Sequence, residues 1–160
     1  LIGHSERRHV FGETDAQVAL KVVAARRDGL IPVICVGETL EERRAGRVDE
    51  VILRQLAAAV QALKGGEGRF LVAYEPVWAI GTGETATPED AAAAHATLRA
   101  ELESTIGIAA ALRTPLLYGG SVNAANAADL LAAAEVDGVL VGGASLDAMS
   151  FTGIAAAGAG

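Results

Sequence analysis

The sequence predicts an α/β fold built around a parallel β-sheet. Three observations lead to this: short apolar runs recur along the chain, helical patterns fill the intervals, and glycine or helix-capping residues mark the junctions. A short run that is apolar throughout is typical of a strand buried on both faces, as parallel strands usually are. Regular alternation of such strands with helices indicates right-handed βαβ units.

The apolar runs are the predicted strands. They are LIPVICVG at 30–37, RFLVAYE at 69–75, TPLLYGG at 114–120 and DGVLVGG at 137–143. The chain begins with LIGH, a pattern typical of the end of a further strand, so we expect it to start in mid-domain. These patterns alone leave two architectures open, an open doubly wound sheet and part of a (β/α)8 barrel.

Capping residues mark where the helices should begin. The predicted starts are Asp15 for a helix to residue 28, Thr39 with Glu42 as a capping box, Thr87 with Pro88 at the first helical position, and Asn123 before AANAADLLAAA. A longer helix is expected over 48–63, ended by KGGEG, and a short one over 145–157. The helices therefore fall between successive predicted strands or after the last one.

Composition limits the classes of partner. The 160 residues are 51% hydrophobic and 21% charged, as in globular proteins, and no apolar run is long enough to span a bilayer. A formal net charge of −7 argues against a general binder of nucleic acid or of anionic membranes. The single cysteine, Cys35, cannot form an internal disulfide, which fits a reducing compartment.

Polar and glycine residues gather where the predicted strands end. His4 follows the first strand end, Gly37 and Glu38 follow the second strand, and Glu75 ends the third; glycine turns at 119–121 and 142–143 follow the last two. In parallel α/β folds ligands bind at the carboxyl ends of the strands. Any one βα turn needs glycine or capping residues for structural reasons, but five such turns, with a Glu and a His among them, favour a ligand site.

The turns YGGSV and VGGAS favour a small anion. Glycine allows a ligand to approach the backbone closely, and free N–H groups at the start of a helix attract an anion such as phosphate. Neither turn contains lysine or arginine. The sequence therefore predicts binding by backbone groups.

Glu75 is the candidate general base. It precedes Pro76 and the apolar loop PVWAIGTGE. A carboxylate that loses water has a raised pKa, which suits proton abstraction near neutral pH. Bulky apolar residues followed by small ones fit a lid that closes over a ligand and hinges at 81–83. The alternative is a packed surface loop with Glu75 exposed.

Other reactive side chains have structural interpretations. His9 and His95 are expected to be structural, Cys35 to be a small core residue, and Glu6, Arg7 and Arg8 to form a solvated or interfacial charge cluster. A structural role is also the alternative to a catalytic one for His4, since a lone histidine is more often structural.

Five segments together carry a specific resemblance. They are GHSERR at 3–8, CVGETLEER at 35–43, AYEPVWAIGTG at 73–83, YGGSV at 118–122 and DGVLVGGASL at 137–146. In content, order and spacing they resemble the triosephosphate isomerase family, and the resemblance covers the whole chain. It implies a partial (β/α)8 TIM barrel, from the end of strand 4 through strand 8. Residues 1–160 would then form one incomplete domain that lacks βα units 1–3.

The resemblance also implies an activity. The family interconverts dihydroxyacetone phosphate and D-glyceraldehyde 3-phosphate through an enediol(ate), in glycolysis and gluconeogenesis. By similarity, Glu75 would be the base and His4 a neutral electrophile; this family is itself a well-known example of such pKa tuning and loop closure. Gly81, Ser121, Gly142 and Gly143 match the groups that hold the phosphate. No metal or cofactor is implied, and the complete protein would be a cytoplasmic homodimer.

Two features depart from the family. The Asn-x-Lys motif of the first barrel strand, whose lysine contacts substrate, has no counterpart in the 160 residues, so we expect this chain alone to be inactive. Glu84 stands where relatives often carry a non-acidic residue at the lid hinge. Rival interpretations are another phosphate-handling barrel isomerase, such as those of tryptophan or histidine synthesis, and a non-catalytic phosphate-binding module or an inactive gene fragment. The lid motif beside Glu75 argues against the first.

Overall fold

The computed structural model describes residues 1–63, 69–81 and 84–158. Its sheet contains four parallel strands in chain order: β1 (Val33–Val36), β2 (Leu71–Tyr74), β3 (Leu116–Tyr118) and β4 (Gly138–Val139). Each strand lies inside a predicted apolar run, so the strand predictions are confirmed. Ile2 forms a parallel bridge with Ile34, which places the predicted strand end at the start of the chain beside β1.

The helices lie between and after these strands. They are α1 (Ser5–His9), α2 (Asp15–Arg27), α3 (Leu40–Arg44), α4 (Val48–Gln61), α5 (Pro88–Ile106), α6 (Ile108–Ala111), α7 (Ala127–Leu131) and α8 (Ala148–Ala157), with short 3-10 turns η1 (Val77–Ala79) and η2 (Gly143–Leu146). None of the helices in the described ranges is both long and apolar enough to cross a membrane. The predicted stop KGGEG lies outside the described residues.

Two of the predicted helix starts are confirmed by their capping bonds. Thr39 and Glu42 form the expected capping box at α3. Thr87 caps α5, its hydroxyl accepts the N–H of Asp90, and Pro88 is the first helical residue. A cap of this kind satisfies backbone N–H groups that have no partner within the helix.

The other two predicted starts are wrong. Thr14, not Asp15, caps α2, because its hydroxyl accepts the N–H of Gln17 while the Gln17 side chain accepts the N–H of Thr14. The Asn123 carboxamide accepts the N–H groups of Ala125 and Asn126 and so closes a turn ahead of α7, which is shorter than predicted. In both cases a polar side chain near the start bonds to local backbone groups. The Thr14-x-x-Gln17 spacing is that of a capping box, so the sequence did carry a signal for the start of α2.

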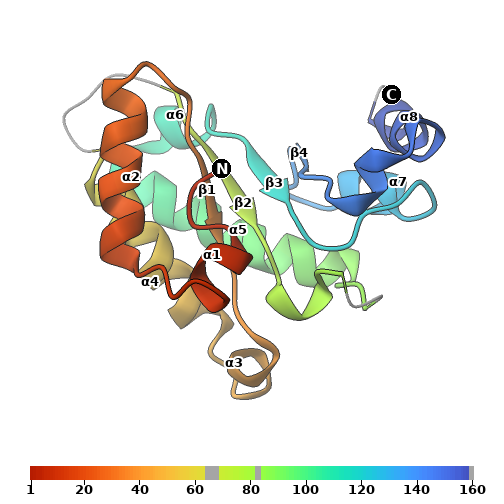
Figure 1. Ribbon diagram of the computed structural model, residues 1–160, viewed down its shortest axis with the longest axis horizontal. Helices are drawn as coiled ribbons and strands as arrows, with labels where there is room; N and C mark the ends of the chain where they lie inside the picture. The colour runs from red at the N-terminus through yellow and green to blue at the C-terminus, as the bar shows by residue number, and fades with distance from the viewer. Residues whose placement is uncertain (64–68, 82–83, 159–160) are drawn as a thin grey trace.

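The order of strands and helices decides between the two architectures. Each strand pairs with the next one in the chain, and the helices α2, α4, α5, α7 and α8 each contact the next in that series. Figure 1 shows this series running alongside the sheet, from α2 near one edge to α7 and α8 near the other. A doubly wound sheet would reverse its strand order and place helices on both faces. The arrangement is that of part of a (β/α)8 barrel.

The core lies between the sheet and the helix layer. Its fully buried members include Ile34, Val72, Tyr74, Leu116 and Tyr118 on the strands and Val18, Val22, Ile52, Leu56, Leu98 and Leu102 on the helices. Successive residues such as Val72, Ala73 and Tyr74 are all buried, so β2 is covered on both faces, as a parallel strand should be. Full burial of each large apolar side chain contributes about 1.5–3 kcal/mol to folding.

Candidate active site

A cavity of about 380 Å³ lies at the carboxyl ends of the strands. It is lined by Leu1, His4, Glu75, Ile80, Gly81, Gly119, Gly120, Ser121, Val122, Leu140, Val141, Gly142, Gly143 and Ala144. All six site residues predicted from the sequence are in this set: His4, Glu75, Gly81, Ser121, Gly142 and Gly143. The fold therefore brings together residues that are up to 139 positions apart, from His4 to Gly143 (143 − 4).

Glu75 is buried, with only 2% of its surface exposed, so the alternative of an exposed carboxylate is wrong. Its Oε2 accepts the backbone N–H of Ser5 at 2.9 Å, and its Oε1 lies 3.3 Å from Nε2 of His4. The carboxylate is thus held against the start of α1, with one oxygen beside the imidazole.

Burial controls the proton affinity of Glu75. Loss of water raises the pKa of the Glu75 carboxyl, and this effect prevails over His4, the Ser5 N–H and the Cys35 thiol, which lower it. Burial likewise raises the pKa of the Cys35 thiol, so the thiol stays protonated and can donate. A carboxylate with a raised pKa is the more effective base near neutral pH.

His4 is oriented by its own backbone neighbourhood. Its Nδ1 accepts the N–H of Glu6 at 3.3 Å, and His4 is the N-cap of α1. A ring nitrogen that accepts a hydrogen bond carries no proton, so this contact assigns the ring N–H of His4 to Nε2. Nε2 is the nitrogen that faces Glu75, which makes it a hydrogen-bond donor at the site.

The glycine turns leave space around the base and the ligand. A Cβ on Gly119 would lie 2.9 Å from Cγ of Glu75, so only glycine leaves room for the Glu75 side chain there. A Cβ on Gly142 or Gly143 would meet no atom within 4 Å, which shows that this backbone borders open space. Ser121 joins the 119–121 turn to η1 in the loop after Glu75, because its N–H and hydroxyl both donate to the carbonyl of Ala79, at 2.9 and 2.6 Å.

The apolar loop after Glu75 is anchored by a buried carboxylate that the cavity does not include. Glu38 is fully buried and accepts hydrogen bonds from Trp78 Nε1 at 2.9 Å and from the Tyr74 hydroxyl at 3.1 Å. Arg43 lies 3.4 Å from the same carboxylate and stacks over the Trp78 ring at 4.8 Å. Although Glu38 follows a strand end, it supports the loop and does not line the cavity. Gly37 does not line the cavity either, and it lies against the backbone of Glu75. The predicted hinge at 81–83 falls partly outside the described residues.

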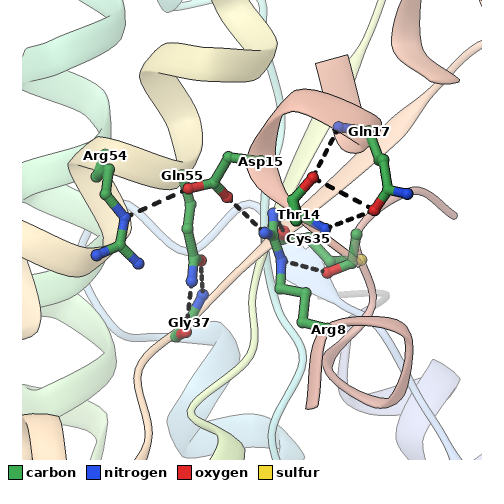
Figure 2. Close-up of polar contacts among 9 residues, drawn as sticks. Arg8, Thr14, Asp15, Gln17, Cys35, Gly37, Arg54 and Gln55 are labelled. Atoms are coloured by element: carbon green, nitrogen blue, oxygen red, sulfur yellow. Dashed lines mark hydrogen bonds and ion pairs between the residues drawn. The ribbon is translucent and has the colours of Figure 1, made fainter. Parts of the chain in front are cut away.

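Arg8 is a supporting residue that sequence reasoning missed. The sequence predicts a solvated or interfacial charge cluster here, and the solvated alternative is wrong for Arg8, whose side chain is only 8% exposed. Its guanidinium donates to the carbonyls of Gly3, at 2.8 Å, and Cys35, at 3.3 Å, and pairs with Asp15 at 2.6 Å (Figure 2). These bonds hold the residues beside His4 and Glu75. No local pattern could have shown this, since the partners come from three elements.

The remaining reactive residues lie away from the cavity. His9 is exposed, and His95 is buried in α5 with Nδ1 3.0 Å from the carbonyl of Glu135. Cys35 is buried in β1, as predicted.

Comparison with known proteins places this geometry in a family. A family model described as triosephosphate isomerase matches residues 1–158. The chain belongs to the triosephosphate isomerase family. A triosephosphate isomerase from Delftia acidovorans is 59% identical over 157 residues, covering 98% of this chain and 62% of the relative. One from Paracidovorax citrulli is 57% identical over 159 residues, covering 99% and 62%, and one from Moorella thermoacetica is 55% identical over 156 residues, covering 96% and 62%.

Membership of the triosephosphate isomerase family agrees with the partial barrel seen in the structure. The chain spans about 62% of the length of these relatives. The sheet β1–β4, with Ile2 beside β1, accounts for a corresponding part of an eight-stranded barrel.

Proposed function

We propose that the whole protein interconverts dihydroxyacetone phosphate and D-glyceraldehyde 3-phosphate through an enediol(ate), as an aldose–ketose isomerase of glycolysis and gluconeogenesis. The observation that carries this is the buried Glu75 carboxylate, 3.3 Å from the Nε2 of His4, at the wall of a cavity that also contains the glycine turns. Family membership supports the same activity.

The two side chains suit a proton transfer next to a carbonyl. Glu75 removes a proton from the carbon beside the carbonyl and returns it to the neighbouring carbon. His4 donates from Nε2 to the carbonyl oxygen, which stabilises the charge that develops there, and then moves protons between the two oxygens. Because Oε1 and Nε2 are close together, they can meet adjacent carbon and oxygen atoms of one small substrate.

The phosphate of the substrate is assigned to backbone groups at Gly81, Ser121, Gly142 and Gly143. None of the described residues that line the cavity is a lysine or an arginine. Backbone N–H groups in glycine turns are suited to an anion, and the open space at Gly142 and Gly143 lets it approach.

Activity tests need a full-length protein, because the chain spans only part of its relatives. We define this protein as a chimera in which the present chain replaces the matched part of the Delftia acidovorans relative. Turnover of D-glyceraldehyde 3-phosphate by this protein tests the proposed function directly. Binding of a triose phosphate without turnover would favour the phosphate-binding module instead.

Gly142→Val should raise the KM for D-glyceraldehyde 3-phosphate in the full-length protein, by about 10-fold or more, because the new side chain blocks backbone approach to the phosphate. The unliganded fold has space for a Cβ at this position, so the variant should still fold. Steady-state kinetics measure the effect, and circular dichroism checks the fold. An unchanged KM in a folded variant would place the phosphate site elsewhere.

The raised pKa of Glu75 predicts where activity is lost in acid. The base must be ionised, so kcat/KM should fall as pH drops through the raised folded-state pKa, above the ~4.3 of a free glutamate. The same shift affects stability. Because the folded protein binds the Glu75 proton more tightly than the unfolded chain does, the protonated carboxyl stabilises the fold at low pH, and this stabilisation is lost as pH rises through the raised folded-state pKa. A kcat/KM profile from about pH 4 to about pH 8 measures the acid limb. A limb at the ordinary glutamate value would contradict the prediction.

By family resemblance, we also propose that the complete protein is a cytoplasmic homodimer and needs no metal or cofactor. The mechanism supports the last point, because the abstracted proton lies next to a carbonyl that His4 polarises. Size-exclusion chromatography with light scattering on the full-length protein tests the dimer, and assay after treatment with a chelator tests the independence from metals.

A further inference from the structure

We propose that Gln55, on helix α4, is a positioning residue for the base Glu75 and acts on it through the peptide groups of Gly37. This inference rests on the proposed isomerase function. Gln55 does not line the cavity and does not touch the carboxylate, so its effect would be transmitted through the backbone.

The contact between Gln55 and Gly37 is two-sided and buried. The N–H of Gly37 donates to Oε1 of Gln55 at 2.8 Å, and Nε2 of Gln55 donates to the carbonyl of Gly37 at 3.2 Å. Gln55 is 4% exposed. Figure 2 shows the carboxamide reaching from α4 to Gly37. Two bonds from one planar amide fix both the position and the orientation of Gly37.

Gly37 in turn lies directly against the backbone of Glu75. A Cβ on Gly37 would stand 1.8 Å from the carbonyl oxygen of Glu75 and 2.5 Å from its carbonyl carbon. The flanking residues pair across the same point: the N–H of Glu75 donates to Val36 at 2.7 Å, and that of Val77 donates to Glu38 at 3.0 Å. Any movement of Gly37 is therefore passed to Glu75.

On its other side, Glu75 has Gly119 as a close neighbour. Gly119 approaches its side chain, where a Cβ would lie 2.9 Å from Cγ, and the N–H of Gly119 is bonded to the carbonyl of Tyr74 at 2.7 Å. Glu75 is thus held in a slot between Gly37 and Gly119. A displacement of one wall changes the approach of the carboxylate to substrate, and proton transfer is sensitive to errors of this size.

The alternative is that Gln55 only satisfies buried backbone groups. A residue with that role alone lowers the yield or stability of folded protein, and the molecules that remain folded keep their turnover. A positioning role instead lowers kcat in folded protein. KM then changes little, because the backbone groups proposed to bind the phosphate belong to other segments of the chain. Comparison of kcat with KM therefore separates the two roles.

The test uses the full-length protein and three variants. Gln55→Met keeps the length of the side chain but loses both bonds. Gln55→Glu keeps the bond accepted from the Gly37 N–H and loses the donated one. Gln61→Met makes the same chemical change at an exposed position of α4 and serves as the control. Steady-state kinetics are normalised to the folded fraction measured by circular dichroism.

We expect kcat for Gln55→Met to be lower by about 10-fold to about 100-fold than that of the unmodified full-length protein, which serves as the wild type. KM should stay within about 2-fold of its value. Gln55→Glu should lie between Gln55→Met and wild type, and Gln61→Met should equal wild type. A folded Gln55→Met variant with wild-type kcat, or with a change in KM alone, overturns the proposal. If Gln55→Met does not fold, Gln55→Glu decides: reduced kcat supports the role, and wild-type kcat overturns it. Failure of the proposed function is distinct, because the unmodified full-length protein would then not isomerise the substrate.

Discussion

Glu75→Gln is expected to abolish isomerisation by the full-length protein while it leaves binding of a triose phosphate intact. The amide keeps the shape of the side chain but cannot accept a proton from carbon. The kcat should fall by at least about 100-fold, the contribution typical of a general base, which corresponds to about 2.7 kcal/mol in the activation barrier. The bond from the Ser5 N–H has an acceptor in the amide oxygen as well, so the local fold should persist.

The matched control for this variant is Glu89→Gln. Glu89 is an exposed carboxylate in the first turn of α5, and it does not line the cavity. Steady-state kinetics with D-glyceraldehyde 3-phosphate give kcat for both variants, and calorimetry gives the affinity for the ligand. Near-wild-type kcat in Glu75→Gln would show that another group is the base.

Local signals in the sequence were sufficient for most of the fold. The strands were visible as apolar runs because both faces of a parallel strand are buried, as Val72, Ala73 and Tyr74 show. Thr87 with Pro88 marked the start of α5 because the cap and the fixed backbone angle of proline act within one turn. The predicted site residues converge on one cavity for a topological reason: parallel strands place their carboxyl ends at one edge of the sheet.

Long-range contacts were beyond sequence reasoning. Arg8 resembles a surface charge in the run GHSERR, yet it binds carbonyls on two other segments. Gln55 resembles an ordinary polar helix residue, and only the packing of α4 on β1 shows that it pairs with Gly37. These roles depend on which segments meet, and spacing along one segment does not encode that.

The 160-residue chain by itself is expected to associate and to be inactive. Large apolar side chains are exposed at both ends of the structure, with Phe11 at 65% and Leu20 at 71% near α2, and Leu146 at 90% and Met149 at 82% near α8. The sheet edges at Ile2 and β4 carry backbone groups that a further strand could pair with. Exposed apolar surface and open sheet edges both favour association.

The cavity gives the reason for inactivity. It is lined from the ends of the described strands only, and Leu1, the first residue of the chain, forms part of its wall. An eight-stranded barrel surrounds its site with eight loops, and closure of the site excludes water from the reacting groups. In the chain alone, solvent can reach His4, whose side chain is already 30% exposed. The sequence of this chain also lacks the Asn-x-Lys motif that the family uses to place a cation beside the substrate.

The 160-residue chain and the full-length protein should differ both in size and in activity. On size-exclusion chromatography the 160-residue chain should elute well above the size of its 16.2 kDa monomer, whereas the full-length protein should give one defined species. The kcat of the 160-residue chain should be at least about 100-fold below that of the full-length protein, because the reacting groups are no longer enclosed and aligned. Adding the unmatched part of the Delftia acidovorans relative as a separate chain should restore part of the activity, since the apolar faces then have a partner. A monodisperse 160-residue chain with full activity would contradict this prediction and show that the four-stranded sheet is a sufficient scaffold.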